Sequence, residues 1–407
     1  MNVQSIEKKL HQKLEKPTLF EGLIGEVIKR RRLEQRLTQE ALSKGLCSIS
    51  YLSKLENNKA KPDVYVVEEV SKRVGIPVYD LKYSDIGLLD IHKALNAFFY
   101  GDIAKIDHML DCDQSLVHPT IVQIVTLIRN VAHHEHKTSV ATISKLEPLV
   151  HSMPLEESLI FLVFSMIYYF EIGHNKKALS IAWMLDQKPF DNDYLKAIYH
   201  LYAYIIKQTV NHKASSFKHY NQAEKVLLEY TGIELSIQLK LYHVYFSFGE
   251  HKDEAKRLFD NIPASNILPK HTNFYLYLNM LWTIDSSMLD DIYSRSIVNK
   301  YDIWYYRLSR YYAMATQSEI EIDNHQNPVF QYEVAILQLL KLNDENETID
   351  FIKNILLPLS VSIESIPEIT EQFAKLITHT KNNKRYKEAM AQEHKKQKII
   401  AQIENVS

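Results

Sequence analysis

The stretch LTQEALSKGLCSISYLSKLENNKAKP, residues 37–62, decides how the first part of the chain folds. Thr38 is a good N-cap, because its hydroxyl can accept from the free N–H groups of a first helical turn, and the helix should run to about Lys44. Gly45 can take the left-handed conformation that ends a helix. Ser48 can then cap a second helix, which the following asparagine pair ends. The pattern predicts two short helices joined by a tight turn.

The second of these helices has two unlike faces. Leu52 and Leu55 point inward at a spacing of three residues. The opposite face offers Ile49, Ser50, Tyr51 and Lys54 to an outside partner. A helix of this kind can enter the major groove of DNA and read base edges. An ordinary helical hairpin is the alternative interpretation.

Charge favours DNA over the ordinary hairpin. From Ile28 to Lys61 there are nine Lys or Arg against three acids, in a chain whose net charge is −2. One basic face on an otherwise acidic protein is typical of phosphate binding. We therefore expect a double-stranded DNA operator as the partner of this region.

The same stretch resembles a known family. Its L-T-Q, its C-S-x-S-Y-L-S-K-L-E-N segment, its basic turn and Pro62 are similar to the Cro/C1-type (Xre) helix-turn-helix domain. The variant is the one seen in peptide-responsive regulators of Gram-positive bacteria, the RRNPP family. The resemblance covers residues 24–86 and includes Ile76-Pro77 after the domain.

The resemblance implies roles for individual residues. Gln39 and Asn57 would hold DNA phosphates, Ser50, Tyr51 and Lys54 would face bases, and Arg32 would pair with Glu56 inside the domain. With the outward face of the second helix, the expected DNA-binding residues are Gln39, Ser48, Ile49, Ser50, Tyr51, Lys54, Asn57 and Lys59.

Two further helices complete the expected domain. Residues 18–35 should form its first helix. Its inward positions are Leu23, Val27, Ile28 and Leu33, and its outward positions are Arg30, Arg31 and Arg32. A fourth helix should run from Val64 to Val74 and bury its valines, and Gly75 should end it.

Composition makes the whole chain all-α. Its 407 residues are too many for one core, glycine is scarce at nine, and no alternation of strands and helices appears. We expect an N-terminal extension at 1–17, the helix-turn-helix domain at 18–80, a linker at 81–90, and a helical repeat domain at 91–400. Two cysteines without a disulfide framework fit the cytoplasm. The longest apolar run, Leu159–Phe170, is too short for a bilayer, so no membrane association is expected.

Glycines mark a repeat in the second region. Gly101, Gly173 and Gly249 each follow a long apolar helix and are 72 and 76 residues apart, near twice the 34-residue tetratricopeptide period. This predicts a tetratricopeptide-like α-solenoid, and an irregular helical array is the alternative. The remaining hairpins are expected at 118–150, 194–230, 271–298, 302–341 and 344–378, followed by a charged capping helix from Lys381.

The inner face of a helical solenoid can bind an extended chain. Taking Gly249 as a turn, we place Leu239, His243 and Phe246 on this face, and Tyr275, Asn279 and Trp282 in the next repeat. An asparagine amide can donate to and accept from one peptide unit. Tyr306, Arg307 and Arg310 could receive a peptide carboxylate. The expected peptide-binding residues are His243, Tyr275, Asn279, Arg307 and Arg310, although each could instead make an ordinary interhelical contact.

Patterns for catalysis or metal binding are weak. His133-His134-Glu135-His136 lacks the spacing that places two histidines on one helix face. There is no glycine-rich phosphate loop and no nucleophile elbow. We expect neither an enzyme, nor a metal, nor a cofactor.

Three functional hypotheses follow. The first is a cytoplasmic quorum-sensing transcription regulator that binds DNA and is controlled by a short signalling oligopeptide, as the resemblance implies. The second is an Xre-type regulator whose repeats bind a protein partner. The third is a scaffold or phosphatase-like regulator that no longer uses its DNA-binding domain, which the basic recognition helix argues against. A homodimer or higher oligomer is expected, because one helix-turn-helix unit reads few base pairs.

Overall fold

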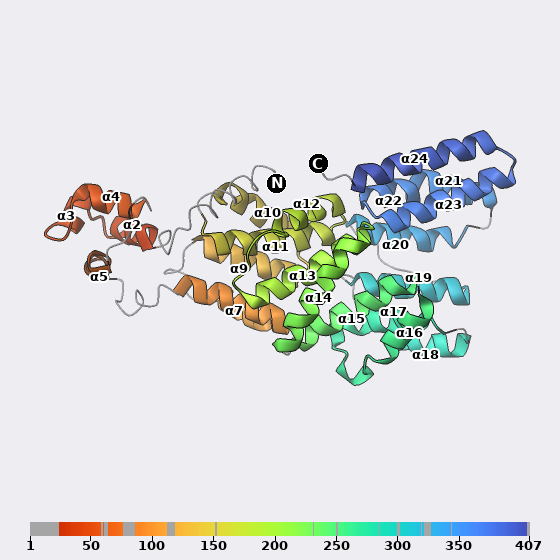
Figure 1. Ribbon diagram of the computed structural model, residues 1–407, viewed down its shortest axis with the longest axis horizontal. Helices are drawn as coiled ribbons and strands as arrows, with labels where there is room; N and C mark the ends of the chain where they lie inside the picture. Colours follow the sequence, from red (N-terminus) through yellow and green to blue (C-terminus); the bar gives the residue numbers. More distant parts are fainter. Residues whose placement is uncertain are drawn as a thin grey trace. The chain divides into compact units, whose positions relative to one another are not determined.

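The computed structural model describes residues 24–57, 60, 64–75, 86–111, 119–150, 153–230, 232–249, 251–283, 285–298, 302–318, 320, 327–342 and 344–404. In these ranges the regular structure is helical and no strand occurs (Figure 1). No helix among them is both long and apolar enough to cross a membrane. The expectations for residues 1–23, for Lys59 and for the linker before residue 86 fall outside the described residues.

The chain divides into two compact units, Met1–Ser165 and Met166–Ser407. The helices of the first are α2 (Ile24–Glu34), α3 (Gln39–Ser43), α4 (Ile49–Glu56), α5 (Val64–Arg73), α7 (Ile86–Tyr100), α8 (Ile103–Asp111), α9 (Pro119–Ala132), α10 (His136–Leu146) and the start of α11 (Leu155–Glu171).

The second unit continues from α11 through two series of helices. The first series is α12 (Asn175–Leu185), α13 (Asp193–Thr209), α14 (Lys213–Glu229), α15 (Ile233–Phe248), α16 (Lys252–Asp260), α17 (Thr272–Met280), α18 (Ser286–Ser294) and α19 (Ile303–Thr316). The second is α20 (Pro328–Leu339), α21 (Glu345–Phe351), a π-helical segment (Ile352–Leu356), α22 (Leu357–Ser362), α23 (Ile366–Asn382) and α24 (Tyr386–Glu404).

The predicted helix-turn-helix is confirmed. The Thr38 hydroxyl accepts from the amide of Ala41 at 3.1 Å and begins α3, and the Ser48 hydroxyl accepts from the amide of Tyr51 at 3.1 Å and begins α4. Gly45 has a φ of +74° in the turn between them. The side-chain caps and the left-handed glycine therefore act as the sequence predicts.

One small core holds α2, α3, α4 and α5 together. Its buried members are Ile28, Leu42, Leu52, Leu55, Val67, Val70 and Val74. The expectations for the ends of α2 were wrong at two residues: Leu33 is 58% exposed, while Arg32 is only 7% exposed. Arg32 is inside because Glu56 receives its guanidinium there, as the resemblance implied.

Helical hairpins follow this domain, as predicted. Gly101 and Gly173, at φ +72° and +81°, lie in the turns after α7 and α11. The pairs α9–α10, α13–α14 and α17–α18 occupy three of the expected hairpins. The expected hairpin at 302–341 is also present, since α19 packs on α20, and α22 packs on α23 within the expected 344–378. Two further pairings were not predicted: α20 packs on α22, and α23 packs on α24.

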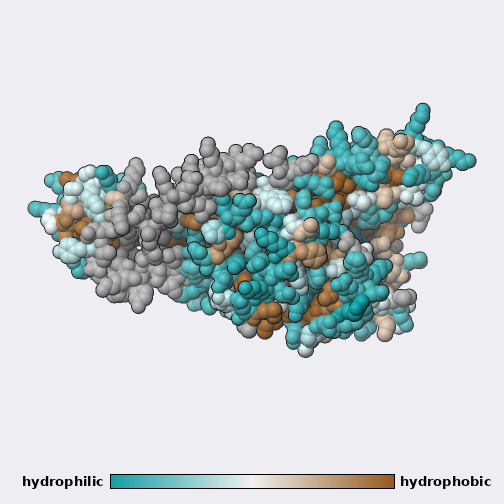
Figure 2. Space-filling view, in the orientation of Figure 1, coloured by the Kyte–Doolittle hydropathy of each residue, from teal (hydrophilic) through white to brown (hydrophobic). Residues whose placement is uncertain are grey.

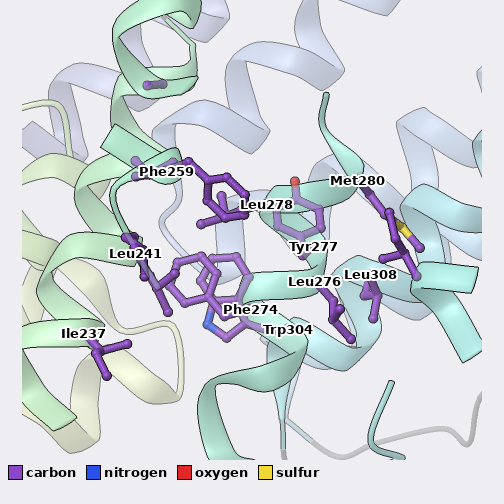
Figure 3. Packing of buried hydrophobic residues seen from close by; sticks show 14 of the residues in the cluster. Ile237, Leu241, Phe259, Phe274, Leu276, Tyr277, Leu278, Met280, Trp304 and Leu308 are labelled. Carbon is purple, nitrogen blue, oxygen red and sulfur yellow. The ribbon is translucent and has the colours of Figure 1, made fainter. Parts of the chain in front are cut away.

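Aromatic side chains fill the core of α15–α19. The rings of Phe274 and Trp304 stack at a centroid distance of 3.4 Å, and Tyr277 and Leu278 lie beside them (Figure 3). Tyr242 and Tyr245 of α15 reach the same indole at 5.7 Å and 5.2 Å. This stacking fixes α15, α17 and α19 against one another.

The turn after α11 is bound to helices far along the chain. The Asn175 side chain donates to the carbonyl of Ile363 at 2.9 Å, across 188 residues of sequence. A Cβ at Gly173 would come within 3.0 Å of both Ile363 and Val329. Since its φ is also positive, Gly173 is required by both conformation and space.

Two more hydrogen bonds secure this turn. The Glu364 carboxylate accepts from the amide of Lys176 at 2.6 Å, and the Asn327 side chain donates to the carbonyl of Glu171 at 3.1 Å. The α11–α12 turn is therefore tied to both ends of the segment α20–α22.

On the face drawn in Figure 2, hydrophilic side chains predominate and hydrophobic ones form small separate groups.

Candidate functional sites

The first candidate site is the outward face of α4. Leu52 and Leu55 anchor the helix in the core, at 0% and 1% exposed. Ile49, Ser50 and Lys54 lie exposed on the other side. Tyr51 is half-buried against the core, so only part of its side chain is available. The helix therefore presents a short row of side chains that a rigid support holds in place.

A buried ion pair, in which every donor and acceptor is paired, supports α4 in addition to this core. Arg32 donates through Nε to Glu56 Oε1 at 2.6 Å and through Nη2 to Oε2 at 2.9 Å. Gln39 adds a third donor to Glu56 Oε2 at 2.7 Å. The hydrogen bond with Glu56 raises the pKa of Arg32 more than burial lowers it. Because every member is satisfied, the pair fixes α2, α3 and α4 in one arrangement.

Gln39 and Asn57 lie at the two ends of the helix-turn-helix. Part of the Gln39 amide is used by Glu56, as just described. Asn57 accepts from Lys29 Nζ at 3.0 Å and donates to the carbonyl of Ser53 at 2.7 Å. Both residues are oriented by protein contacts, and whether they hold phosphates stays a prediction.

A pocket opens beside Asn57, between α2 and α4. Its volume is about 430 Å³ and its lining is Lys29, Arg30, Leu33, Glu34, Glu56 and Asn57. Two of these side chains are basic and two are acidic. A phosphate held by Asn57 would lie beside the ammonium of Lys29, which donates to Asn57 at 3.0 Å.

The predicted peptide-binding residues of α15 and α17 face their neighbouring hairpins. His243 shares a hydrogen bond with Tyr204 at 3.0 Å, and Tyr275 stacks on Phe259 at 4.9 Å. Burial lowers the pKa of His243 below its usual value. Leu239, which we placed on the inner face, is instead buried at 2% exposed. The inner-face register assigned from Gly249 is wrong at Leu239.

Asn279 lies one turn after Tyr275 on α17 and is half-buried. Trp282, on the same side of the helix, packs on Phe259 at 5.1 Å. Two other side chains of α15, Tyr242 and Tyr245, reach Trp304. His243, Tyr275 and Asn279 are therefore not brought together with Arg307 and Arg310 by any described contact.

Arg307 and Arg310 belong to a cluster of opposite charges. Glu333 Oε1 accepts from Arg307 Nε at 3.0 Å, and Glu333 Oε2 lies 3.0 Å from Arg310 Nη1. Glu368 Oε1 lies 3.7 Å from Arg307 Nη2. The guanidinium of Arg307 also lies over Tyr245, at 5.5 Å from its ring centre. We call these five residues the arginine–glutamate cluster.

The charges in this cluster change one another's pKa values. Burial works against the cation of Arg307, but Tyr245, Glu333 and Glu368 raise its pKa well above the usual value. Burial raises the pKa of Glu368, and Arg307 offsets only part of this effect. Both arginines already face internal carboxylates, so a peptide carboxylate would have to compete with Glu333 for them.

Sequence reasoning missed both glutamates. Glu333 sits inside an apolar run, QYEVAILQLL, where a single acid is costly unless a cation meets it. This single acid in an apolar run was the signal that could have predicted a buried ion pair. Glu368 follows Pro367 in the first turn of α23, where an acid also suits the helix dipole, so its sequence context gave no comparable signal.

The histidine-rich turn pairs with neighbouring charges. His133 Nε2 lies 3.0 Å from both oxygens of Asp107, and Glu135 accepts from Arg129 at 2.8 Å. Within the described ranges no group of three or more His, Cys, Asp or Glu is arranged to hold a metal ion. These contacts support a structural role for the turn.

Comparison with known proteins identifies the N-terminal domain. The helix-turn-helix family matches residues 28–81, which contain α3, α4 and α5 and the saturated pair between α2 and α4. The protein thus carries a DNA-binding domain of the helix-turn-helix class, followed by a helical repeat-like region. Among curated proteins no match was found.

A solved structure is similar to this chain at a distance. It is the crystal structure of Bacillus thuringiensis PlcR in complex with the peptide PapR7 and DNA, at 16% sequence identity and a TM-score of 0.37. The similarity covers 67% of this chain and 99% of that one. At so low a TM-score it carries no conclusion on this chain.

Proposed function

We propose that this protein is a cytoplasmic transcription regulator that binds operator DNA through α4. The observation that carries the proposal is the exposed row Ile49, Ser50 and Lys54 on a helix whose other face is fixed by Leu52 and Leu55. A rigid helix with exposed donors is what major-groove recognition needs. The local excess of basic residues supplies attraction to phosphates.

The substitution Lys54→Ala tests this proposal. Operators would first be selected from random duplex DNA with the full-length protein. The variant should lose about 1–3 kcal/mol of affinity for the selected sequence, because a base-edge contact is removed while the core stays intact. Gel shifts over a salt series measure the loss. Lys72→Ala on α5, where Lys72 pairs with Glu69 on the surface, is the matched control.

Two results would contradict the proposal. Wild-type affinity of Lys54→Ala for the selected operator would show that α4 does not read bases. Failure of the wild-type protein to enrich any duplex would remove DNA recognition altogether.

We further propose that the DNA-binding form is a two-fold dimer, with half-sites about one helical turn or a multiple apart. One helix-turn-helix presents too few base contacts for useful specificity, so the repeat region would supply the dimer contact. Light scattering of the protein with and without operator is the measurement. A strict monomer in both states would rule the dimer out.

The repeat region, in this proposal, is tetratricopeptide-like and binds a short signalling oligopeptide that changes DNA affinity, as in quorum sensing. The arginine–glutamate cluster supports this role, since Arg307, Arg310 and Glu368 are partly exposed charges and Arg307 lies over the ring of Trp304 at 4.8 Å. His243, Tyr275 and Asn279 remain predicted contacts. Peptide and DNA must then affect each other's binding by the same factor.

A further inference from the structure

Two carboxylates of the arginine–glutamate cluster are incompletely paired. Glu333 is 1% exposed, and its Oε2 makes no hydrogen bond with any described protein atom, although Arg310 lies 3.0 Å away. Glu368 Oε2 is buried and has no hydrogen-bond donor, and its other oxygen is 3.7 Å from Arg307, beyond hydrogen-bond distance. A buried acceptor without a donor is costly.

A third acceptor lies on the next turn of α23. Gln372 is fully buried; its Nε2 donates to the Tyr332 hydroxyl at 2.7 Å, and its Oε1 has no donor. Gln372 follows Glu368 by four residues, so the two side chains lie on one face of the helix. This face of α23 thus carries two acceptors that no described residue satisfies.

Charges of both signs surround Glu368. Arg307 and Arg310 act on it as cations and Glu333 acts on it as an acid, so the two carboxylates are balanced by the two arginines. The unpaired acceptors therefore define what this place can bind. A ligand group that brings hydrogen-bond donors would be stabilised here.

We propose that the signalling peptide binds Glu368 through a primary ammonium group, either its N-terminal amine or a lysine side chain. This inference rests on the proposed peptide-binding function. An ammonium is compact and carries three donors, which suits a single unpaired oxygen. A guanidinium would need both oxygens of the carboxylate for its two-pronged grip, and Glu368 Oε1 already faces Arg307.

Synthetic heptapeptide pools of random sequence provide the probe. Four pools would be prepared, with and without lysine and with free or acetylated N-termini, and offered to the purified full-length protein. Bound peptides would be identified by mass spectrometry and measured by calorimetry. We expect enrichment only where a primary ammonium is present, and removing that ammonium should weaken the enriched peptide about tenfold or more.

Glu368→Gln is the variant that links this effect to one residue. It should weaken the enriched peptide about tenfold or more, and it should abolish the difference between the free and the neutralised peptide. Glu371→Gln is the matched control, because Glu371 lies on the same helix, exposed, and pairs with Lys375. It should bind the peptide like wild type.

The outcomes separate the two proposals. Equal enrichment from the acetylated, lysine-free pool would overturn the ammonium inference and leave peptide binding intact. An ammonium preference that survives Glu368→Gln unchanged would likewise overturn the assignment to Glu368. Binding from none of the pools would reject the peptide-binding function itself, and the inference with it. The wild-type comparison of pools decides the ammonium requirement even if the variant fails to fold.

Discussion

Two buried arginine–glutamate sites, one in the helix-turn-helix domain and one in the second unit, differ in how fully their carboxylate oxygens are paired. In the helix-turn-helix domain, both oxygens of Glu56 accept from Arg32, and Gln39 adds a further donor. In the second unit, Glu333 is shared between two arginines and Glu368 keeps an oxygen without a donor. Glu56 therefore has no oxygen left for a further hydrogen-bond donor, whereas Glu368 can accept one.

The difference separates the structural role of the first site from the binding role that we propose for the second. A saturated buried pair holds its helices in one arrangement and gains nothing from a ligand. An unsaturated pair costs free energy in the free protein, and a ligand that supplies the missing donor recovers it. Exposure agrees with this division, because Glu56 is fully buried while Glu368 retains 14% of its side-chain surface.

The largest expected effect is that of Arg32→Ala. It leaves Glu56 buried without its cation, so the helix-turn-helix domain should lose about 3–5 kcal/mol of stability. Hydrogen exchange of α2 and α4 amides in the full chain measures this. Arg31→Ala is the control: Arg31 pairs with the exposed Glu34, and its loss should change stability by less than about 0.5 kcal/mol.

Arg310→Ala should cost less, about 1–3 kcal/mol. Glu333 would keep the hydrogen bond from Arg307 Nε, so its charge would not be left alone. Exchange of the α19 and α20 amides reports the effect. A loss as large as that of Arg32→Ala would mean that the two sites are equally saturated, and the contrast drawn between them would fail.

A third charged network extends the contrast to pH. It joins Asp186 after α12 to Lys207 of α13 and His219 of α14, and His219 in turn contacts His200 of α13. Burial and the neighbouring His219 lower the pKa of His200 from 6.5 to about 3. The unfolded chain therefore takes up a proton below pH 6.5 that the folded chain does not, and stability should fall as pH drops. The part of this loss that His200 contributes between pH 6.5 and 5 should be at most about 2 kcal/mol.

Denaturant unfolding followed by tryptophan fluorescence measures this slope. The slope should shrink in His200→Gln and stay unchanged in His251→Gln, since His251 is exposed in the turn before α16. An unchanged slope in His200→Gln would show that His200 is protonated in the folded state and that this network, too, can accept a further charge.

Local signals in the sequence were sufficient for the helices. Thr38, Ser48 and Gly45 specify α3, α4 and their turn through contacts within four residues, so caps and turns could be predicted. Leu33 could not, because its exposure depends on where α2 meets the rest of the domain. A residue at the end of an amphipathic helix has no periodic neighbour beyond it to fix its side.

The inner face of the repeats was harder to predict. The register taken from Gly249 places Leu239 on the inner face of the repeats. The packing of Tyr242 and Tyr245 on Trp304 instead orients α15 so that Leu239 is buried. That packing joins residues about sixty positions apart, and a single sequence shows no sign of it. The pairing of α20 with α22 was missed for the same reason, since several helix pairings fit similar loop lengths.

The tie between the α11–α12 turn and α20–α22 also bears on how the second unit comes apart. An open helical array can lose its hairpins one after another from either end. Here Asn175 and Ile363 close a loop of 188 residues, so the last helices cannot separate without breaking contacts made by the first. Closing so long a loop slows folding, because its entropy must be lost before the contacts form. The second unit should therefore unfold in one cooperative transition. Gly173, where no side chain fits, allows the close contact on which this cooperativity depends.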